Sequence, residues 1–533
     1  MFRRYHHCVT SVEWPDNTLY SDLLPIAVDV DVFHLILECL PHADLLKITL
    51  ASKFTREEAT KELLMRPVRL LRNKNLRTFC RFALAGDPRR LSYLRNLTIE
   101  HIEKPFSSED RETFADVLTR CTNLRKLELR WCDALLMEEH VVPEAISPLP
   151  NLTYLSAIMY KDSKESQTLL LRMVANMKSS LHSLHLPMIE DGLSKVEVLQ
   201  DLVMVHGNLE EFTLQFSTFT APGVTFSAVR DLHLTLEENV PRLRDLCSTF
   251  PSVRELSIDY HMHLGETPPD NTENSHLGDG SCWPSLDRLR ASTSIIRILG
   301  IVCPVRRLDL GYYDSDLHDK IAETVSRLRP SKFTLNLYCA ADWAAPRAHP
   351  SLLLHGSGDA GVRHLFVKTT FSSSRSPTTQ DFMNCIHPLL LTARVELLHV
   401  AISELFTSDD PDEIVDPPMK VNPDVPTIDA EALAVDWAQA CASIRTVAVT
   451  IALVGHTVWS VDRADGEARV VKLGAFEGRR VLDQEAQRCI QTSLLIINPG
   501  DSARGWGSYI MASIRKGTLE RLLYSGIFVE SAV

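Results

Sequence analysis

The chain lacks the motifs that indicate a metal centre, a phosphate-binding loop or a catalytic triad. Its twelve cysteines include no C-x-x-C pair, which disfavours a zinc site, and their wide spacing disfavours a dense disulfide framework. His261 and His263 have no partners at ligand spacing. There is no G-x-x-x-x-G-K-[ST], no H-E-x-x-H and no G-x-S-x-G. We therefore expect reduced, mostly buried thiols, no metal, no cofactor and no enzymatic activity.

Long apolar runs and an excess of positive charge are also absent. No segment approaches the about 18 consecutive apolar residues that a membrane-spanning helix needs. Residues 1–23, which we interpret as an N-terminal extension, contain no apolar stretch typical of a secretory signal. The formal net charge of −13 disfavours nucleic acid and anionic membranes as partners. We expect a soluble cytoplasmic or nuclear protein that binds neither nucleic acid nor membrane.

What the sequence does contain is a repeated hexad of the form L-x-x-L-x-L. The first copies begin at Leu94, Leu124, Leu152, Leu181 and Leu209, with steps of 30, 28, 29 and 28 residues. Looser copies begin at Val229, Val253, Leu286, Val305, Val362, Val395 and Ile444. Alternation within the hexad predicts a short strand whose first, fourth and sixth residues face the core. Since 533 residues exceed one compact core, the repeat favours an elongated array.

Helical patterns separate the hexads. Apolar residues recur at i, i+3, i+4 and i+7 from Phe114 to Cys121, from Leu170 to Met177 and from Val198 to Val205. One strand and one helix cannot cover their apolar faces alone, so neighbouring units must stack. The predicted fold is α/β, with parallel strands inside an arc and helices outside. An ordinary α/β domain is the alternative, because L-x-x-L also occurs by chance.

The array is expected to cover residues 71–454. Pro-rich, Gly-rich or acidic stretches predict exposed loops near 265–280, 340–361 and 407–429. From residue 455 to 533 the pattern changes to a hairpin around Asp465-Gly466, a helix with Leu482, Ala486 and Ile490, and a strand-like TSLLII. We interpret this last part as a C-terminal repeat or cap.

The segment Leu124 to Cys132, LRKLELRWC, resembles the leucine-rich repeat pattern L-x-x-L-x-L-x-x-N/C. The array is irregular, since Tyr160, Ile189 and Ser217 stand where that pattern has Asn or Cys. A target protein is expected on the concave face, where strand residues between the core positions point outward. The candidate target-binding residues are Lys126, Glu128, Arg130, Glu211, Thr213, Gln215, Asp231, His233, Thr235, Arg307 and Asp309.

Residues 24–70 are predicted to form a small module of three helices. The first stops near Pro41, and the third opens at Thr55, with Glu58 at capping-box spacing, and ends before Pro67. A unit this small cannot cover all of its apolar residues, which suggests that part of its surface meets a partner.

This module resembles an F-box. The matches are Asp31, Val32-Phe33, Ile36-Leu37, Leu40-Pro41, Asp44-Leu45-Leu46 and Ser52-Lys53-Phe54, whereas Asp29 replaces the usual Pro. An F-box before leucine-rich repeats is the layout of substrate-recognition subunits of SCF-type cullin–RING ubiquitin ligases. The resemblance implies a ligase adaptor subunit and its cullin complex as partners, besides an unknown protein target. The residues that would bind the adaptor, or form the small core beneath that interface, are Val32, Phe33, Ile36, Leu37, Leu40, Pro41, Leu45 and Leu46.

Two other functions stay open on the sequence. The chain could be a repeat scaffold with no ubiquitin role, in which residues 28–67 only shield the first repeat. It could also be a regulator of a GTPase, a class whose leucine-rich repeats have a similar period.

Overall fold

The computed structural model describes residues 30–486 except 86, 103–106, 137–139, 159–163, 190–201, 203–206, 217–222, 237–239, 261–282, 314–317, 340–360, 373–378, 392, 406–427, 452–454 and 464–465. The chain divides into two compact units, Met1–Met65 and Arg66–Val533. Several predicted features lie wholly or almost wholly outside the described residues. They are the three loops expected from composition, the histidines at 261 and 263, and the strand-like TSLLII.

The described part of the first unit consists of the helices α1 (Val30–Cys39), α2 (His42–Ile48) and α3 (Lys53–Met65). Pro41 separates α1 from α2, as its fixed φ and missing N–H require. One side chain from each of α1 and α2 and two from α3 form the core, and Phe33, Leu40 and Ile48 pack against it. The core residues are Leu37, Leu45, Ala59 and Leu63.

The third helix begins two residues before the predicted start at Thr55. The backbone N–H of Thr55 donates to Ser52 Oγ at 3.1 Å, and that of Ser52 donates to Thr55 Oγ1 at 2.9 Å. This reciprocal pair caps the helix, so Ser52 fills the role that the sequence spacing assigned to Thr55. Glu58 instead lies beside His34 and Lys61, with its Oε2 at 3.5 Å from His34 Nε2.

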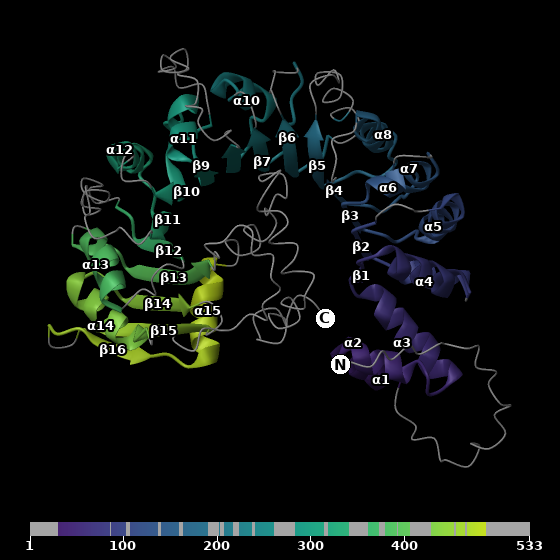
Figure 1. Ribbon diagram of the computed structural model, residues 1–533, viewed down its shortest axis with the longest axis horizontal. Coiled ribbons are helices and arrows are strands. Elements are labelled where there is room, and N and C mark those ends of the chain that lie inside the picture. The colour runs from purple at the N-terminus through teal and green to yellow at the C-terminus, as the bar shows by residue number, and fades with distance from the viewer. Residues whose placement is uncertain are drawn as a thin grey trace, which may run out of the picture. The chain divides into compact units, whose positions relative to one another are not determined.

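The second unit is α/β and contains one long sheet whose strands follow chain order (Figure 1). Pairing is parallel from β1 to β14 and antiparallel between β14, β15 and β16. The described strands are β1 (Val68–Leu70), β2 (Asn96–Glu100), β3 (Lys126–Arg130), β4 (Tyr154–Ile158), β5 (Ser183–Ile189), β6 (Glu211–Phe216), β7 (Asp231–Leu236), β8 (Glu255–Tyr260), β9 (Leu286–Ala291), β10 (Val305–Tyr313), β11 (Lys332–Cys339), β12 (His364–Ser372), β13 (Leu397–Leu405), β14 (Thr446–Ile451), β15 (Gly455–Asp462) and β16 (Arg469–Lys472).

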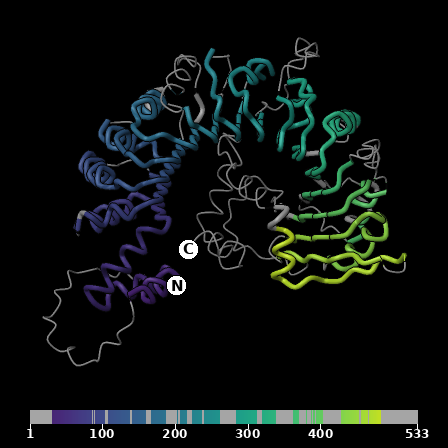
Figure 2. Tube along the Cα trace, turned by 180° about the vertical axis from the view of Figure 1, so that it is seen from behind, coloured from purple at the N-terminus to yellow at the C-terminus, as the bar shows by residue number. Residues whose placement is uncertain are grey.

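Helices connect these strands and lie mainly along the outer face of the curved sheet (Figures 1 and 2). They are α4 (Asn73–Leu84), the 3-10 helix η1 (Pro88–Tyr93), α5 (Ser108–Arg120), α6 (Asp133–Leu136), α7 (Val141–Ile146), α8 (Lys164–Ala175), α10 (Leu243–Thr249), α11 (Thr293–Leu299), α12 (His318–Leu328), α13 (Thr379–Leu390), α14 (Ala430–Ala440) and α15 (Ala475–Ala486). Parallel strands need such crossover connections, and because every strand pairs with its neighbours in chain order the arrangement is solenoid-like.

The hexads set the register of the sheet. Their fourth residues stand opposite one another, so that Leu127 pairs with Leu97 and with Leu155. These leucines are fully buried, as are the first residues Leu94, Leu124 and Leu152. The predicted helix from Phe114 to Cys121 corresponds to α5 with its buried C-cap.

The end of the sheet differs from the parallel part. The predicted hairpin is confirmed, since β15 and β16 pair antiparallel on either side of Gly466, whose φ is +84°. Helix α15 lies against β15, and a Cβ added to Gly478 would stand 3.3 Å from Val458. Val458 is opposite Ala448, which is opposite His399, so α15 covers the inner face at this end.

Two features differ from the sequence predictions. Residues 68–70, expected within the helical module, form β1 and pair with β2. The prediction of reduced thiols is wrong for Cys247, whose sulfur is disulfide-bonded. Sequence spacing could not reveal that bond, because a disulfide depends on which sulfur atoms the fold brings together. Six other described cysteines are free: Cys39, Cys80, Cys121, Cys132, Cys303 and Cys441.

Candidate interaction surfaces

The first unit exposes an unusual amount of apolar surface. Thirteen large apolar side chains are exposed among the described residues, and seven of them lie in this small unit. Those seven are Val30, Val32, Leu35, Ile36, Leu46, Leu50 and Phe54, with exposed fractions between 45% and 64%. Because many exposed apolar side chains on one small unit favour a contact site, the helices present a candidate docking surface.

The structure divides the eight residues expected at the adaptor interface. Leu37 and Leu45 are buried and belong to the core, so neither offers surface to a partner. Phe33 and Leu40 are half-buried. Val32, Ile36, Pro41 and Leu46 are exposed. The sequence missed Val30, Leu35, Leu50 and Phe54, which complete the exposed set. We call the seven exposed large apolar residues the apolar helical surface.

One end of the inner face carries a connected network of ion pairs. Glu128 pairs with Lys126 and with Arg130, each at 2.8 Å. Arg130 also reaches Glu100 at 3.4 Å, and Arg69 binds the same carboxylate at 2.8 Å. Burial alone would raise the pKa of Glu128, but the hydrogen bond from Lys126 and the charge of Arg130 hold it below its usual value. These charges compensate one another within the sheet.

Further ion pairs lie on β7 to β11. Asp309 Oδ2 is 2.7 Å from Arg288 Nε, and its Oδ1 is 3.0 Å from Arg307 Nε. Thr334 also donates to Asp309. Although burial opposes ionisation, the two guanidinium groups hold the pKa of Asp309 below its usual value. Asp259 lies 3.5 Å from His233 and 3.8 Å from Arg290.

Burial therefore corrects the set of inner-face candidates. Glu128, Thr235 and Asp309 are buried, with exposed fractions of 5%, 7% and 6%. Neighbouring strands lie only about 4.8 Å apart, so side chains on the inner face cover one another and form ion pairs. Lys126, Arg130, Thr213, Gln215, Asp231, His233 and Arg307 are half-buried, and Glu211 is exposed. The structure places these residues on one face, but the three buried ones do not offer the outward-pointing side chains that were expected.

A different row of charges was missed at the sequence level. The second residue of the hexad is Arg in seven of twelve copies, whereas Lys and Arg together make up about a tenth of the chain. These seven, which we call the arginine rim, are all exposed: Arg95, Arg125, Arg230, Arg254, Arg306, Arg363 and Arg445. The repeated L-R and V-R pairs that begin the hexads were the available signal. The target-binding residues expected from the sequence all lie inside the strands.

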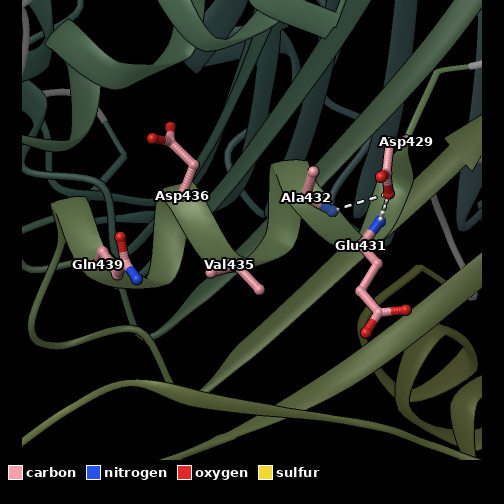
Figure 3. Close-up of a pocket in the computed structure, with 6 residues that line it drawn as sticks. All are labelled: Asp429, Glu431, Ala432, Val435, Asp436 and Gln439. Atoms are coloured by element: carbon pink, nitrogen blue, oxygen red, sulfur yellow. Dashed lines mark hydrogen bonds between the residues drawn. The ribbon is translucent and has the colours of Figure 1, made fainter.

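One shallow hollow of about 420 Å³ lies at the start of α14 (Figure 3). Its lining residues are Asp429, Glu431, Ala432, Val435, Asp436 and Gln439. The Asp429 carboxylate accepts the backbone N–H groups of Glu431 and Ala432, so it caps the helix. Asp436 lies 3.4 Å from His387. This lining holds no nucleophile next to a base, and the arrangement suggests no reaction.

In the described part of the chain, no group of three His, Cys, Asp or Glu side chains is placed to hold a metal ion. Among the same residues, no helix has the length and apolar character needed to cross a membrane. Neither protein-family models nor curated proteins gave a match to this chain. The surfaces described above are therefore the basis for assigning a function.

Proposed function

We propose that this protein is a substrate-recognition subunit of an SCF-type cullin–RING ubiquitin ligase. In this proposal the first unit is an F-box that binds the ligase's adaptor subunit, and the second is a leucine-rich-repeat solenoid that binds a target protein. In this role the chain does not itself catalyse the formation of a covalent bond. By holding a target beside the charged conjugating enzyme, it raises the effective concentration of the target's lysines.

The observation that carries this proposal is the division of apolar residues within the first unit. Leu37, Leu45, Ala59 and Leu63 already fill the core. Ile36 and Leu46, the sequence neighbours of two of these core residues, are 45% and 49% exposed. An N-terminal cap that only shields a repeat would have no need for an outward apolar face. A docking module needs both a core and such a face.

The second unit supports the proposal through its free surfaces. Its core is built by the register of the hexads, which leaves the inner face and the edges of the sheet for contacts. Large curved sheets of stacked repeats offer long surfaces suited to protein targets. The location that fits this role is the cytoplasm or the nucleus, where the ligase and its targets occur.

The proposal is tested by co-purification of the full chain with the ligase adaptor. The double variant Ile36→Asp/Leu46→Asp places two charges on the apolar helical surface and should weaken adaptor binding at least tenfold, since each exposed anchor contributes about 1–2 kcal/mol. Val302 and Val471 are similarly exposed in the second unit, so Val302→Asp/Val471→Asp is the matched control and should bind normally. Absence of adaptor binding by the unaltered chain would refute the proposal.

A further inference from the structure

The arginine rim follows one edge of the sheet. Six of its residues stand at or just before the first residue of a strand, and Arg306 is the second residue of β10. Because β1 to β14 run parallel, these positions share the N-terminal edge. Backbone bonds fix the row, as the N–H of Arg125 donates to the carbonyl oxygen of Arg95 at 2.8 Å and that of Arg254 to Arg230 at 2.8 Å.

The rim arginines differ from those of the inner face. Arg130, Arg288 and Arg307 each pair with a carboxylate of the sheet. None of the seven rim guanidinium groups has a hydrogen-bond or ion-pair partner in the structure, as far as the described residues show. They are exposed cations whose charge the fold itself does not compensate.

The spacing between rim arginines on neighbouring strands allows two of them to bind one anion. Arg95 and Arg125 lie on neighbouring strands, and so do Arg230 and Arg254. At a strand separation of about 4.8 Å, two guanidinium groups can contact one carboxylate or phosphate together. Without an anion, such like charges side by side on neighbouring strands repel each other.

From β8 onward the arginines occupy every second strand: Arg254, Arg306, Arg363 and Arg445. Alternate strands are about 10 Å apart. A helix places successive residues of one face about 10 Å apart at seven-residue intervals. An acidic helix lying along the edge would therefore offer one carboxylate to each of these arginines.

We infer that the arginine rim is a binding site for an acidic segment of a protein, whose carboxylates or phosphates are held by the guanidinium groups of neighbouring and alternate strands. The inference rests on the proposed function in one respect: the protein that contains the acidic segment is taken to be the target of the ligase. A nucleic acid is disfavoured because Glu210, Asp287 and Glu396 occupy the same hexad position on other strands, and because the chain carries a net charge of −13.

The test uses the full chain and a fluorescein-labelled helical peptide in which pairs of Glu recur every seventh residue, with binding followed by fluorescence anisotropy. The triple variant Arg254→Gln/Arg306→Gln/Arg363→Gln should bind this peptide at least tenfold more weakly. Arg172, Arg244 and Arg297 are exposed on the outer helices α8, α10 and α11, so Arg172→Gln/Arg244→Gln/Arg297→Gln removes the same charge elsewhere. This control should bind like the unaltered chain.

Equal losses in both triple variants, or no loss in either, would overturn the inference. So would tighter binding of a labelled single-stranded oligonucleotide than of the peptide. A phosphoserine version of the peptide shows whether phosphate or carboxylate binds better, and either preference agrees with the inference. Circular dichroism verifies that each variant is folded.

Adaptor co-purification of the same variants separates this inference from the proposed function. If the rim variant still binds the adaptor and its affinity for the peptide is unaltered, only the inference about the arginine rim is refuted. If peptide binding depends on the rim but the chain binds no adaptor, the inference about the arginine rim is supported and the proposed ligase role is refuted.

Discussion

Arg254 donates its backbone N–H to the carbonyl oxygen of Arg230 at 2.8 Å, and this bond joins the starts of two neighbouring strands. The following residue, Glu255, donates to the same carbonyl at 2.9 Å. Equivalent bonds link Thr153 to Arg125 and Arg445 to Glu396. The second residues of these hexads thus form a series of backbone hydrogen bonds along one edge of the sheet. Their side chains are left free to vary, and in this protein these residues are most often arginine.

The first prediction separates the core of the first unit from its surface. Leu45 is fully buried, so Leu45→Ala should lower the free energy of unfolding of this unit by about 2–5 kcal/mol. Leu46 is 49% exposed, so Leu46→Ala should change it by less than about 0.5 kcal/mol while still weakening adaptor binding. Urea denaturation followed by circular dichroism measures the first effect. Similar destabilisation by both variants would mean that Leu46 also belongs to the core.

The second prediction concerns the buried carboxylate of Asp309. Asp309→Asn removes the negative charge between Arg288 and Arg307, whose side chains are only 13% and 12% exposed. Leaving two largely covered guanidinium groups without that charge should cost about 3–5 kcal/mol. Hydrogen exchange should report the loss mainly in β9 to β11. Asp319→Asn, at an exposed position of α12, serves as the control and should leave exchange unchanged. Unaltered exchange in the Asp309 variant would contradict the account of this network.

The third prediction is a pH dependence that arises from His399. Burial and the charge of His456 lower the pKa of His399 from 6.5 to about 4. Between these values the unfolded chain binds a proton at this position and the folded protein does not, so the free energy of unfolding falls as the pH falls from 6.5 to 4. His399→Gln can still hydrogen-bond Thr450 and should remove up to about 3 kcal/mol of this dependence.

Chemical denaturation at pH 7 and pH 4.5 measures this effect. The control variant is His182→Gln, which replaces an exposed histidine in the same way. Burial lowers the pKa of His185 to about 4 as well, so the variant of His399 should reduce the pH dependence without abolishing it. A pH dependence that is the same with and without His399 would contradict this explanation.

The regular hexads made much of the sheet predictable. Leu94 and Leu124 were expected in the core because a strand alternates its faces, and both are fully buried. Strand β11 was missed because a buried Pro330 stands where the other copies have Leu or Val. Strand β1 was missed because its three residues begin only three positions after the end of the last helix of the first unit. In both cases pairing with a neighbouring strand, which the sequence does not show, decides the structure.

The candidate sites were less predictable. Sequence alternation placed Glu128 and Asp309 on the inner face, but their burial depends on Arg130 and Arg288, which come from the same and from neighbouring strands. Similarly, α1 and α2 each contain adjacent apolar residues, and only the packing of α3 decides that Leu45 lies inside and Leu46 outside. In both cases tertiary packing decides which side chains are buried, so residue type and spacing could not predict it.

The most direct test of the account is a calorimetric titration of the purified ligase adaptor into the full chain. The account predicts saturable binding of one adaptor per chain, with a negative heat-capacity change because apolar surface is buried. It also predicts that Ile36→Asp/Leu46→Asp weakens adaptor binding at least tenfold and that Val302→Asp/Val471→Asp leaves it unchanged. Absence of binding by the unaltered chain, or equal binding by both double variants, would contradict the claim that the apolar helical surface holds the adaptor.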